Sequence, residues 1–504
     1  MNKTFTFTLL FILTVPLALA DPLGWSVDRY ITVPPSYIHN PSIDIDHAGN
    51  LHAAYIDYQD GTSQVYYTKL KNDGSPLISN IRVTFNLSEV GNPSLVVDSH
   101  NNIHIVWEAE ENNERQEIYY IKLNDQGIPL TDIKRVTFDP RSSRYPRIAV
   151  DTSENVHLVW LDSRNLNLDV YYKKLDSIGN SLTEDINVSA DALSSYDPDI
   201  DVDLRNNVHI VWSSANEDYY DVSYKKLDNV GRALTPVIRL AVNASDELDH
   251  ASIATDYLGN VHVAWYDEGL EDVFYSKLDN NGNLLIYPAS ITLPGGVSRF
   301  PSLVADLNAN VHITWSESQN PLGNGVYYTK LDNFGRKIVE DLHLTALQGR
   351  EAPFVTDKNE NVHIVWESSD SLFYKRSLQL IRVEGQPVVG NSINISLIDT
   401  SHPALDYAMA MSFNFTNGIP VGDGRVIPLD QDPLFNLTFY HPALIGLHNS
   451  VGQLGTNGIG HVTLQIPDIP ELRGRTISMA FVTTDSRFSI PIVAVSDRFT
   501  MTFI

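Results

Sequence analysis

Short runs rich in Val, Ile, Tyr and Trp recur along the chain, and their side chains alternate between two faces. In one such run an extended backbone puts Val208, Ile210 and Trp212 on one face. The opposite face carries His209 and Val211, so both faces need cover from neighbouring sheets. Asn-Asn pairs and Asp-x-x-Gly phrases between the runs are turn signals. The pattern predicts an all-β chain.

One phrase, Asn-(Val/Ile/Leu)-His followed three residues later by an aromatic residue, occurs seven times. Its histidines are spaced 50 to 53 residues apart: His52, His104, His157, His209, His262, His312 and His363. An aspartate stands six residues before each histidine: Asp46, Asp98, Asp151, Asp203, Asp256, Asp306 and Asp357. The aromatic residues are Tyr55, Trp107, Trp160, Trp212, Trp265, Trp315 and Trp366. A period of this length indicates a repeat architecture.

Each repeat contains four strand-like runs, which in the second repeat cover residues 93–98, 103–108, 117–123 and 133–138. A four-stranded antiparallel meander has two apolar faces, and radial stacking of such sheets around an axis buries both. We therefore expect a β-propeller of seven blades. A six- or eight-bladed form and a linear solenoid are the alternatives.

The fourth-strand pattern follows only six of the repeats, and a seventh copy stands at the front, in residues 28–33. We expect this N-terminal strand to pair with residues 372–376 and close the ring, because closure leaves no open sheet edge. A solenoid would not need complementary ends.

The period stops after Gln379. Strand-like runs at 392–397, 408–415, 461–466 and 477–483 then alternate with Pro and Gly. They predict a C-terminal β-sandwich domain in residues 380–504, after a propeller domain in residues 21–379.

The first twenty residues combine a charged start, an apolar stretch and a small-x-small end at Ala20. This is typical of a signal peptide, residues 1–20, although a membrane anchor is the alternative. The stretch is shorter than the about 20 residues that span a bilayer. Since no later stretch is long enough either, we expect a secreted or cell-surface protein without membrane insertion.

The composition limits the classes of partner that the protein can bind. With 62 acidic and 35 basic residues the formal charge is −27, which repels phosphate backbones and makes nucleic acid an unsuitable partner. The chain has no cysteine, so its stability rests on its core without disulfides.

A polar pair present in every repeat is better explained by structure than by catalysis. We interpret the repeated Asp, His and Trp as a buried network that ties the first strand of a blade to the second. Its members include Asp98, His104, Trp107, Asp151, His157, Trp160, Asp203, His209 and Trp212. The network resembles that of WD-repeat propellers, with a different spacing. The lysines of the Tyr-rich third strand, such as Lys174, are interpreted as blade surface.

Function in propellers depends on the loops of one rim, where the blades differ. The non-repeating positions before the first strands include His39, Arg144, Tyr145, Asp197, Asp249, His250, Arg299, Arg350 and Glu351. The loops after the second strands add Asp162, Arg164 and Asp267. Arginines, carboxylates, His and Tyr together suit a sugar or an acidic glycan, and an ordinary polar rim is the alternative.

Two enzymatic alternatives stay open at this mouth. Arg144-Tyr145-Pro146 and Arg299-Phe300-Pro301 resemble the Arg-x-Pro phrase of sialidases, and Arg350 would complete a clamp for a carboxylate. The Asp-box of sialidase blades is absent, and no Tyr-Glu nucleophile pair is assigned. A polysaccharide lyase would use His39 or His250 with a nearby Tyr as base and acid.

The sequence gives little sign of a cofactor. Asp197, Asp199, Asp201 and Asp203 alternate and would offer oxygen ligands to Ca²⁺, but the glycine-containing loop of a calcium hand is missing.

The whole repeat, Asp-x-x-x-Asn-Val-His-x-x-Trp followed by Asp-x-x-Tyr-Tyr-x-Lys-Leu-Asp-x-x-Gly, resembles the propeller repeats of bacterial and archaeal exoproteins. The resemblance covers residues 28–379 and implies an extracellular or cell-surface location, without implying an activity. The leading hypothesis is a non-enzymatic protein that binds a glycan or an extracellular protein at the propeller mouth. A glycan-active enzyme is the alternative.

Overall fold

The computed structural model describes residues 25–504 apart from short stretches. These stretches are 33–36, 59–60, 86–88, 112–114, 139, 166, 191–192, 216–219, 245–247, 293–294, 307–308, 321–322, 346, 348, 350, 358–360, 369, 378–380, 400–403, 415–417, 421–425, 428, 456–458, 485–491 and 497–498. The expected signal peptide and Arg350 therefore lie outside the described residues.

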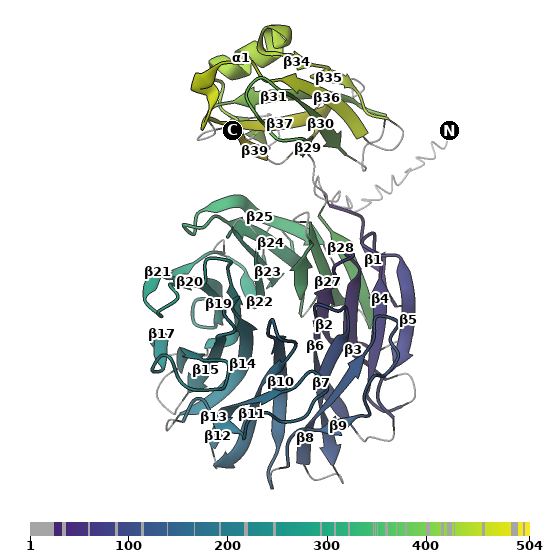
Figure 1. The fold of residues 1–504 in the computed structure, drawn as a ribbon, viewed down its shortest axis with the longest axis vertical. Helices are drawn as coiled ribbons and strands as arrows, with labels where there is room; N and C mark the ends of the chain where they lie inside the picture. The colour runs from purple at the N-terminus through teal and green to yellow at the C-terminus, as the bar shows by residue number, and fades with distance from the viewer. Residues whose placement is uncertain are drawn as a thin grey trace, which may run out of the picture.

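The repeat region consists of four-stranded antiparallel sheets, consistent with propeller blades (Figure 1). The first sheet contains β2 (His39–Ile45), β3 (Leu51–Asp57), β4 (Gln64–Leu70) and β5 (Pro76–Arg82). The second contains β6 (Val90–Val97), β7 (Ile103–Glu111), β8 (Arg115–Leu123) and β9 (Lys134–Arg135). The third contains β10 (Ser143–Val150), β11 (Val156–Asn165), β12 (Asn167–Leu175) and β13 (Ile186–Asn187). The fourth contains β14 (Ser194–Val202), β15 (Val208–Ala215), β16 (Tyr220–Leu227) and β17 (Ile238–Ala244).

The remaining sheets of this region follow the same order. The fifth contains β18 (Leu248–Thr255), β19 (Val261–Asp267), β20 (Asp272–Leu278) and β21 (Leu284–Ser290). The sixth contains β22 (Val297–Ala305), β23 (Val311–Ser318), β24 (Gly325–Leu331) and β25 (Lys337–Thr345). The seventh contains β26 (Phe354–Thr356), β27 (Val362–Ser368), β28 (Ser371–Arg376) and, as its fourth strand, β1 (Arg29–Tyr30).

The N-terminal strand completes the last sheet, as the sequence predicted. Arg29 lies opposite Tyr374, and Tyr30 lies opposite Phe373, in an antiparallel pair between β1 and β28. The first strands also follow one another around a common middle: β2, β6, β10, β14, β18, β22 and β26 contact in that order, and β26 contacts β2 (Figure 1). The contacts among the first strands therefore close on themselves.

Each repeated histidine is buried and bonded on both ring nitrogens. In the third sheet His157 Nε2 lies 3.2 Å from Asp151 Oδ2, and its Nδ1 lies 2.8 Å from the hydroxyl of Tyr172. The same Asp accepts hydrogen bonds from the backbone N–H of Ser153 and Asn155 at 2.9 Å each. The network thus joins the first three strands and the turn between the first two.

The third member of the network is the tyrosine of the third strand and not the tryptophan that the sequence suggested. The Trp side chains are buried in the apolar cores between sheets, where Trp107 packs with Tyr67 of the preceding sheet. Tyr55 and Tyr374 share a core in the same way, between the first sheet and the seventh.

Five of the six repeated lysines are buried and Lys330 is only partly exposed, so their interpretation as blade surface is wrong. Lys174 Nζ lies 2.9 Å from Asp151 Oδ2 and donates to the carbonyl of Asn229, in a turn of the next sheet, at 2.9 Å. In the seventh sheet Arg376 replaces the lysine and donates to the carbonyl of Asn72, in the first sheet, at 3.1 Å. These cations compensate a buried carboxylate and link neighbouring sheets.

Residues 381–504 form two further antiparallel sheets that share one apolar core. One sheet contains β29 (Ile381–Glu384), β30 (Ser392–Ile398), β36 (Ile459–Gln465) and β34 (Leu447–His448). The other contains β35 (Val451–Gln453), β31 (Asp406–Ser412), β37 (Thr476–Thr484), β38 (Ile492–Val495) and β39 (Phe499–Thr502). A small pair joins β32 (Ile419–Pro420) to β33 (Val426–Ile427).

The sequence analysis missed helix α1 (Pro433–Tyr440) in this part of the chain. Asp432 caps it by accepting a hydrogen bond from the backbone N–H of Phe435 at 2.9 Å, and Pro433 occupies its first turn. An Asp-Pro pair is a helix-start signal that was available in the sequence. Two short 3-10 turns, η1 (Pro442–Ile445) and η2 (Pro470–Leu472), complete the described elements. The helices in the described parts of the chain are all too short or too polar to cross a membrane.

Candidate functional site

The first strands of six sheets carry a β-bulge near their start, and the bulge holds a residue in the left-handed backbone region. These residues, with φ between 42° and 55°, are Asn40, Asn92, Tyr145, Asp197, His250 and Phe300. The sequence analysis placed these positions before the strands, whereas they lie inside them. A bulge redirects a side chain, and non-glycine residues in this region store strain that the surrounding structure must hold.

A central channel of about 530 Å³ is lined by the first strands of all seven sheets, from Asn40 in β2 to Val355 in β26. Its wall contains side chains that accept hydrogen bonds from the next sheet. Asp199 accepts from the backbone N–H of Ile253 at 3.0 Å, and Asp201 accepts from that of Thr255 at 2.6 Å.

The four alternating aspartates that suggested Ca²⁺ are thereby divided among three roles. Asp199 and Asp201 bind the neighbouring strand, and Asp203 accepts from His209 at 3.2 Å in the repeated network. Asp197 alone lies at the mouth, in a bulge. Burial raises the pKa of Asp199 to about 6. The residues present therefore do not form one oxygen cage of the kind that Ca²⁺ requires.

At one side of the mouth a chain of hydrogen bonds fixes the bulges. Glu367 accepts from the backbone N–H of Asn40 at 3.2 Å, and Asn40 Nδ2 donates to Asn92 Oδ1 at 3.0 Å. Asn92 Nδ2 donates to Glu108 at 2.9 Å, and the other oxygen of Glu108 accepts from the backbone N–H of Tyr145 at 2.7 Å. These polar groups satisfy one another and hold the mouth in shape.

Next to this chain, on the far side of Tyr145, the mouth opens into a hollow of about 620 Å³, which we call the mouth hollow. It is lined by Ser142, Arg144, Tyr145, Leu161, Ser163, Leu168, Tyr196, Asp197, Asp249 and His250. Five of these residues, Arg144, Tyr145, Asp197, Asp249 and His250, were candidates from the sequence. Since Asp197 and His250 also line the channel, the hollow and the channel adjoin.

Asp197, Asp249 and His250 form a charged cluster in which one ligand atom from each lies within 4.8 Å of the others. His250 Nδ1 is 2.8 Å from Asp249 Oδ2. The ring of Phe300 stands edge-on to the His250 ring at 4.4 Å. The three side chains come from the bulged segments of β14 and β18, which explains why residues 52 positions apart in sequence meet.

The cluster shifts the pKa of each member. Burial, together with the hydrogen bond and charge of Asp249, raises the pKa of Asp197 to about 7. Burial opposes ionisation of Asp249 as well, but His250 and Asp197 hold the pKa of Asp249 well below its usual range. The pKa of His250 is raised by Asp249 and Asp197 despite its burial. The cluster therefore favours a proton shared by the carboxyl pair and favours the protonated form of the imidazole.

Arg144, Tyr145 and Tyr196 supply the exposed part of the hollow. Tyr145 is 40% exposed and Tyr196 is 39% exposed. The guanidinium of Arg144 is exposed and forms no ion pair within the described part of the chain. The hollow thus presents two aromatic faces and one cation that no carboxylate neutralises.

Two other candidates are occupied by structural contacts. Asp162 is buried and accepts from Ser143 at 3.1 Å, from the indole of Trp160 at 2.9 Å and from Arg164 at 2.7 Å. Arg164 also pairs with Asp185 at 2.9 Å. These bonds hold the end of β11 and leave neither side chain directed to a ligand.

The remaining candidates are spread around the rim. His39 and Arg299 line a separate hollow of about 440 Å³ that shares no lining residue with the mouth hollow. Arg299 stacks on Tyr266 and donates to its hydroxyl at 3.3 Å. Asp267 accepts from the backbone N–H of Leu270 at 3.0 Å.

Arg144 and Arg299 therefore line different hollows, and the structure does not bring them together around one carboxylate. Glu351 lines the channel, and its negative charge is among the groups that raise the pKa of His250.

The sequence analysis missed Arg147, which lines the channel. It occupies the place in its repeat that Ser42, Ser94, Ser252 and Ser302 occupy in theirs, two positions after the bulge residue. A departure from serine at this position was the signal in the sequence.

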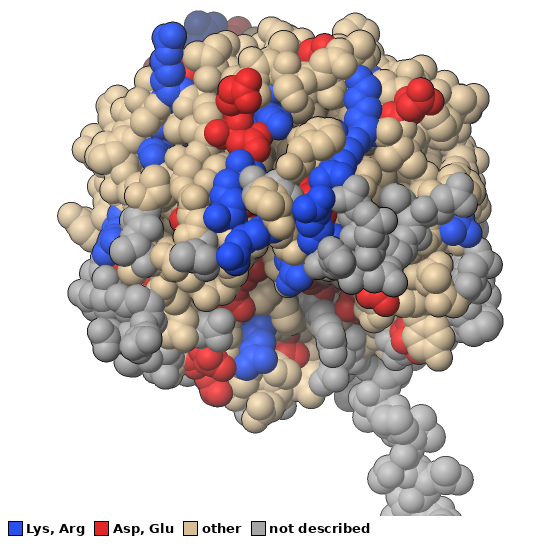
Figure 2. Space-filling model, turned by 90° about the horizontal axis from the view of Figure 1, so that it is seen from below, with Lys and Arg blue, Asp and Glu red and all other residues tan. Residues whose placement is uncertain are grey.

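On the face of the molecule seen from below, Lys and Arg side chains gather around the middle, with Asp and Glu among them (Figure 2).

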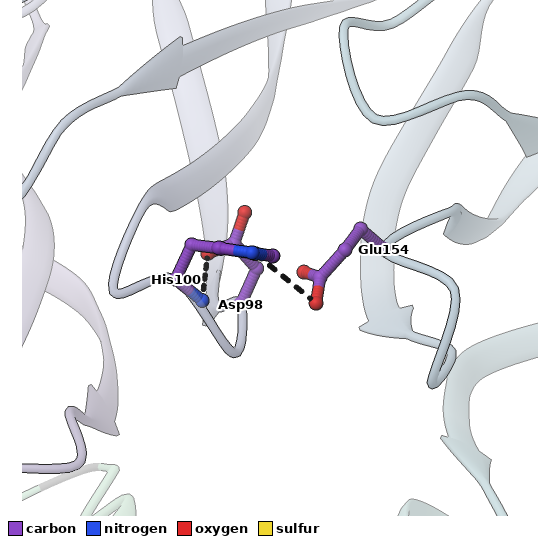
Figure 3. Close-up of side chains that lie close together, drawn as sticks. All are labelled: Asp98, His100 and Glu154. Carbon is purple, nitrogen blue, oxygen red and sulfur yellow. Dashed lines mark hydrogen bonds and ion pairs between the residues drawn. The ribbon is translucent and has the colours of Figure 1, made fainter.

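Asp98, His100 and Glu154 also lie close together, in turns between first and second strands (Figure 3). Asp98 is already bonded to His104 at 3.2 Å and accepts from the backbone N–H of His100 at 2.9 Å. Glu154 accepts from the hydroxyl and the backbone N–H of Ser99 in the neighbouring sheet. The group is explained as a link between sheets.

No family model matches the sequence, and no curated protein matches it. Solved structures with a similar fold include a protein of unknown function from Dyadobacter fermentans, at 10% identity and a TM-score of 0.45, covering 61% of this chain and 98% of that one. A PL25 ulvan lyase has 11% identity and a TM-score of 0.43, with 71% and 93% covered. The Hadza microbial sialidase Hz136 has 13% identity and a TM-score of 0.42, with 67% and 74% covered. Likeness at this level carries no conclusion about what this chain binds.

Proposed function

We propose that the chain is a secreted or cell-surface saccharide-binding protein whose ligand lies in the mouth hollow. In this proposal residues 1–20 are a signal peptide, residues 21–379 form a closed seven-bladed propeller, and residues 380–504 form a β-sandwich that attaches the protein to a partner. The ring of contacts among the seven first strands supports the blade number.

The observation that carries the proposal is the composition of the mouth hollow. Tyr145 and Tyr196 offer exposed aromatic rings on which a sugar face can pack. Asp249, His250 and Arg144 offer charged hydrogen-bonding groups for hydroxyls and acidic substituents. Aromatic faces beside a few fixed polar groups are the arrangement by which proteins orient small polar ligands.

The charge state of the cluster favours binding over catalysis. His250 is paired with Asp249 and its pKa is raised, which favours the protonated ring over the neutral ring that a general base needs. Asp197 and Asp249 share a proton within one cluster, whereas glycosidases keep two carboxyl groups about 5–9.5 Å apart to flank the sugar bond.

A lyase at the same site is the second candidate function, because His250 and Tyr145 do line one hollow. It requires His250 to lose its proton, so its activity would rise with pH. Product formation on a bound saccharide distinguishes it from a binding protein.

The test is a glycan array probed with the mature protein from Asp21, followed by product analysis on every saccharide that binds. Binding that is lost in the double variant Tyr145→Ala, Tyr196→Ala, while the variant keeps the thermal midpoint of unfolding, supports the site. Binding without products supports the binding role, and unsaturated products would establish the lyase. Binding that the double variant keeps in full would place the site elsewhere.

A further inference from the structure

The mouth hollow has an unusual charge balance for so acidic a chain. Asp197 and Asp249 carry one negative charge between them while they share a proton, and the His250 cation neutralises that charge. Arg144 remains as the net charge of the hollow. A guanidinium holds a carboxylate through two parallel hydrogen bonds, which fits an anionic ligand.

The charged groups of the mouth hollow lie close enough to interact electrostatically. Burial raises the pKa of Tyr145. The charges of Glu108, Asp197 and Asp249 raise it further, and Arg144 opposes them. Tyr145 and Arg144 are adjacent in β10, and both line the hollow with the cluster. A negative charge gained at the cluster would therefore act electrostatically on a ligand bound beside Arg144 and Tyr145.

We propose that the ligand is a carboxylate-bearing saccharide held by Arg144, and that the proton shared by Asp197 and Asp249 is required for its binding. This inference rests on the saccharide-binding function proposed above and adds its ligand class and its control. When the shared proton leaves, the two carboxylates carry a second negative charge, which repels the carboxylate of the ligand.

The charged and titratable groups around the cluster come from several elements. β10 contributes Arg144, Tyr145 and Arg147, and β14 contributes Asp197 and Asp199. β18 contributes Asp249 and His250, and the segment before β26 contributes Glu351. The β22 residue in contact with His250 is Phe300, which is uncharged.

Of these groups, Asp197 and Asp199 have pKa values that burial raises to about 7 and about 6, and Asp249 and Asp197 raise the pKa of His250 despite its burial. Loss of any of these protons makes the site more negative, so all three groups act in one direction. A sugar carboxyl is ionised from mildly acidic to mildly alkaline pH.

The experiment measures binding of uronate- and sialate-containing oligosaccharides beside their carboxyl-reduced counterparts, at about pH 6 and about pH 8.5. We expect the acidic oligosaccharide to bind more tightly than its reduced counterpart at the lower pH. We also expect it to lose about fivefold in affinity at the higher pH, the effect of one nearby like charge in a partly solvated site. The reduced oligosaccharide should show no such loss.

The variant Asp197→Asn tests whether the proton shared by Asp197 and Asp249 causes the pH dependence of binding. Asn is suited to the left-handed backbone at this position, where φ is 42°. It keeps the volume and cannot ionise, so between the lower and the higher pH the variant should lose less affinity for the acidic oligosaccharide than the wild type loses. Asp132→Asn, which removes an exposed carboxylate between β8 and β9 and outside the mouth hollow, is the matched control and should retain the dependence of the wild type.

The outcomes separate this inference from the function on which it rests. Equal binding of acidic and reduced oligosaccharides, or a pH dependence as large in Asp197→Asn as in the wild type, overturns the inference and leaves saccharide binding intact. Absence of binding to both kinds of oligosaccharide at either pH overturns the proposed function as well.

Discussion

Gly74 packs directly against the ring of Tyr374, 300 residues later in the chain: a Cβ atom added at Gly74 would lie 2.3 Å from the ring. The same contact joins Gly127 to Tyr67 of the preceding sheet. The turn glycine of the first sheet therefore meets the last sheet as though the two were consecutive. This contact is the most local sign that the repeats close into a ring.

Gly74→Ala should destabilise the protein through both strain and a clash. The residue has φ of 78°, where a Cβ costs about 1–2 kcal/mol. Overpacking against Tyr374 adds about 1–3 kcal/mol. Gly61→Ala is the matched control, because Gly61 has φ of 79° and nothing within 4 Å of an added Cβ. Urea unfolding of the two variants measures the difference, and equal losses would argue that the contact between first and last sheet does not form.

Lys174→Met should reduce stability by about 3–5 kcal/mol, because it leaves the buried carboxylate of Asp151 without the cation at 2.9 Å. Lys71→Met, at an exposed position, removes the same charge and should cost less than about 0.5 kcal/mol. Chemical denaturation checks both variants. A similar small effect at the two positions would restore the interpretation of the repeated lysines as blade surface.

The repeated network should make the protein sensitive to acid. Burial lowers the pKa of six of the network histidines, in the case of His312 to about 4. Their contribution to stability is therefore present above their ordinary pKa near 6.5 and is lost as the pH falls through the lowered values. Burial opposes ionisation of the seven network aspartates, but hydrogen bonds from His, Asn and the backbone, joined in some sheets by Lys, lower their pKa, so their contribution is lost below about pH 4.

Several buried carboxyls outside the network act with the opposite sign, because their raised pKa values stabilise the fold as the pH falls: Asp44, Asp197, Asp199, Asp201, Glu108, Glu317 and Asp341. They offset the histidines between about pH 6.5 and pH 4, so we expect the free energy of unfolding to fall mainly below about pH 4, where the network aspartates lose their contribution. Urea titrations across this range supply the measurement. A stability that stays flat from neutral pH to about pH 2 would show that the network aspartates are not held as buried anions.

Arg144→Ala should weaken binding of an acidic oligosaccharide by about tenfold or more, because a charged hydrogen bond of this kind contributes about 1.5–3 kcal/mol. Its fold should be unaffected, since the side chain is exposed. Arg205→Ala changes the net charge equally outside the mouth hollow and should bind as the wild type does. Isothermal titration of the three proteins provides the comparison, in which an equal loss in both variants would indicate a general charge effect.

Arg164→Ala should lower the free energy of unfolding. The guanidinium bonds the buried Asp162 at 2.7 Å and Asp185 at 2.9 Å, so its removal leaves Asp162 without its cation and should cost about 3–5 kcal/mol. Thermal unfolding monitored by circular dichroism is the measurement. A variant as stable as the wild type would return Arg164 to the candidate ligand-binding residues.

The repeated pattern predicted the sheets well because each unit is specified locally. Alternation in β15 and the aspartate at 203 give a strand, a turn and a buried histidine without reference to the rest of the chain. The closing strand could be predicted for the same reason, since residues 29–30 complete a pattern that is missing at residue 376. Lys174 was misjudged because its carboxylate partner lies on a different strand of the sheet and its carbonyl partner lies in the next sheet.

The sequence predicted which residues lie at the mouth but not how their side chains are arranged. The sequence pointed to Asp197, Asp249 and His250, but the bulges that bring them together depend on the backbone of two neighbouring sheets. The separation of Arg144 from Arg299 depends on the curvature of the ring, which no local pattern reports. Helix α1 was missed because eight residues give too short a period to stand out among strands.

A crystal structure of the mature protein with the tightest-binding oligosaccharide tests the central claim most directly. The account predicts sugar density in the mouth hollow, with a ring on Tyr145 or Tyr196 and an acidic group at Arg144. Density at the outer edges of the sheets or on the C-terminal domain, with the mouth hollow filled only by water, would contradict it.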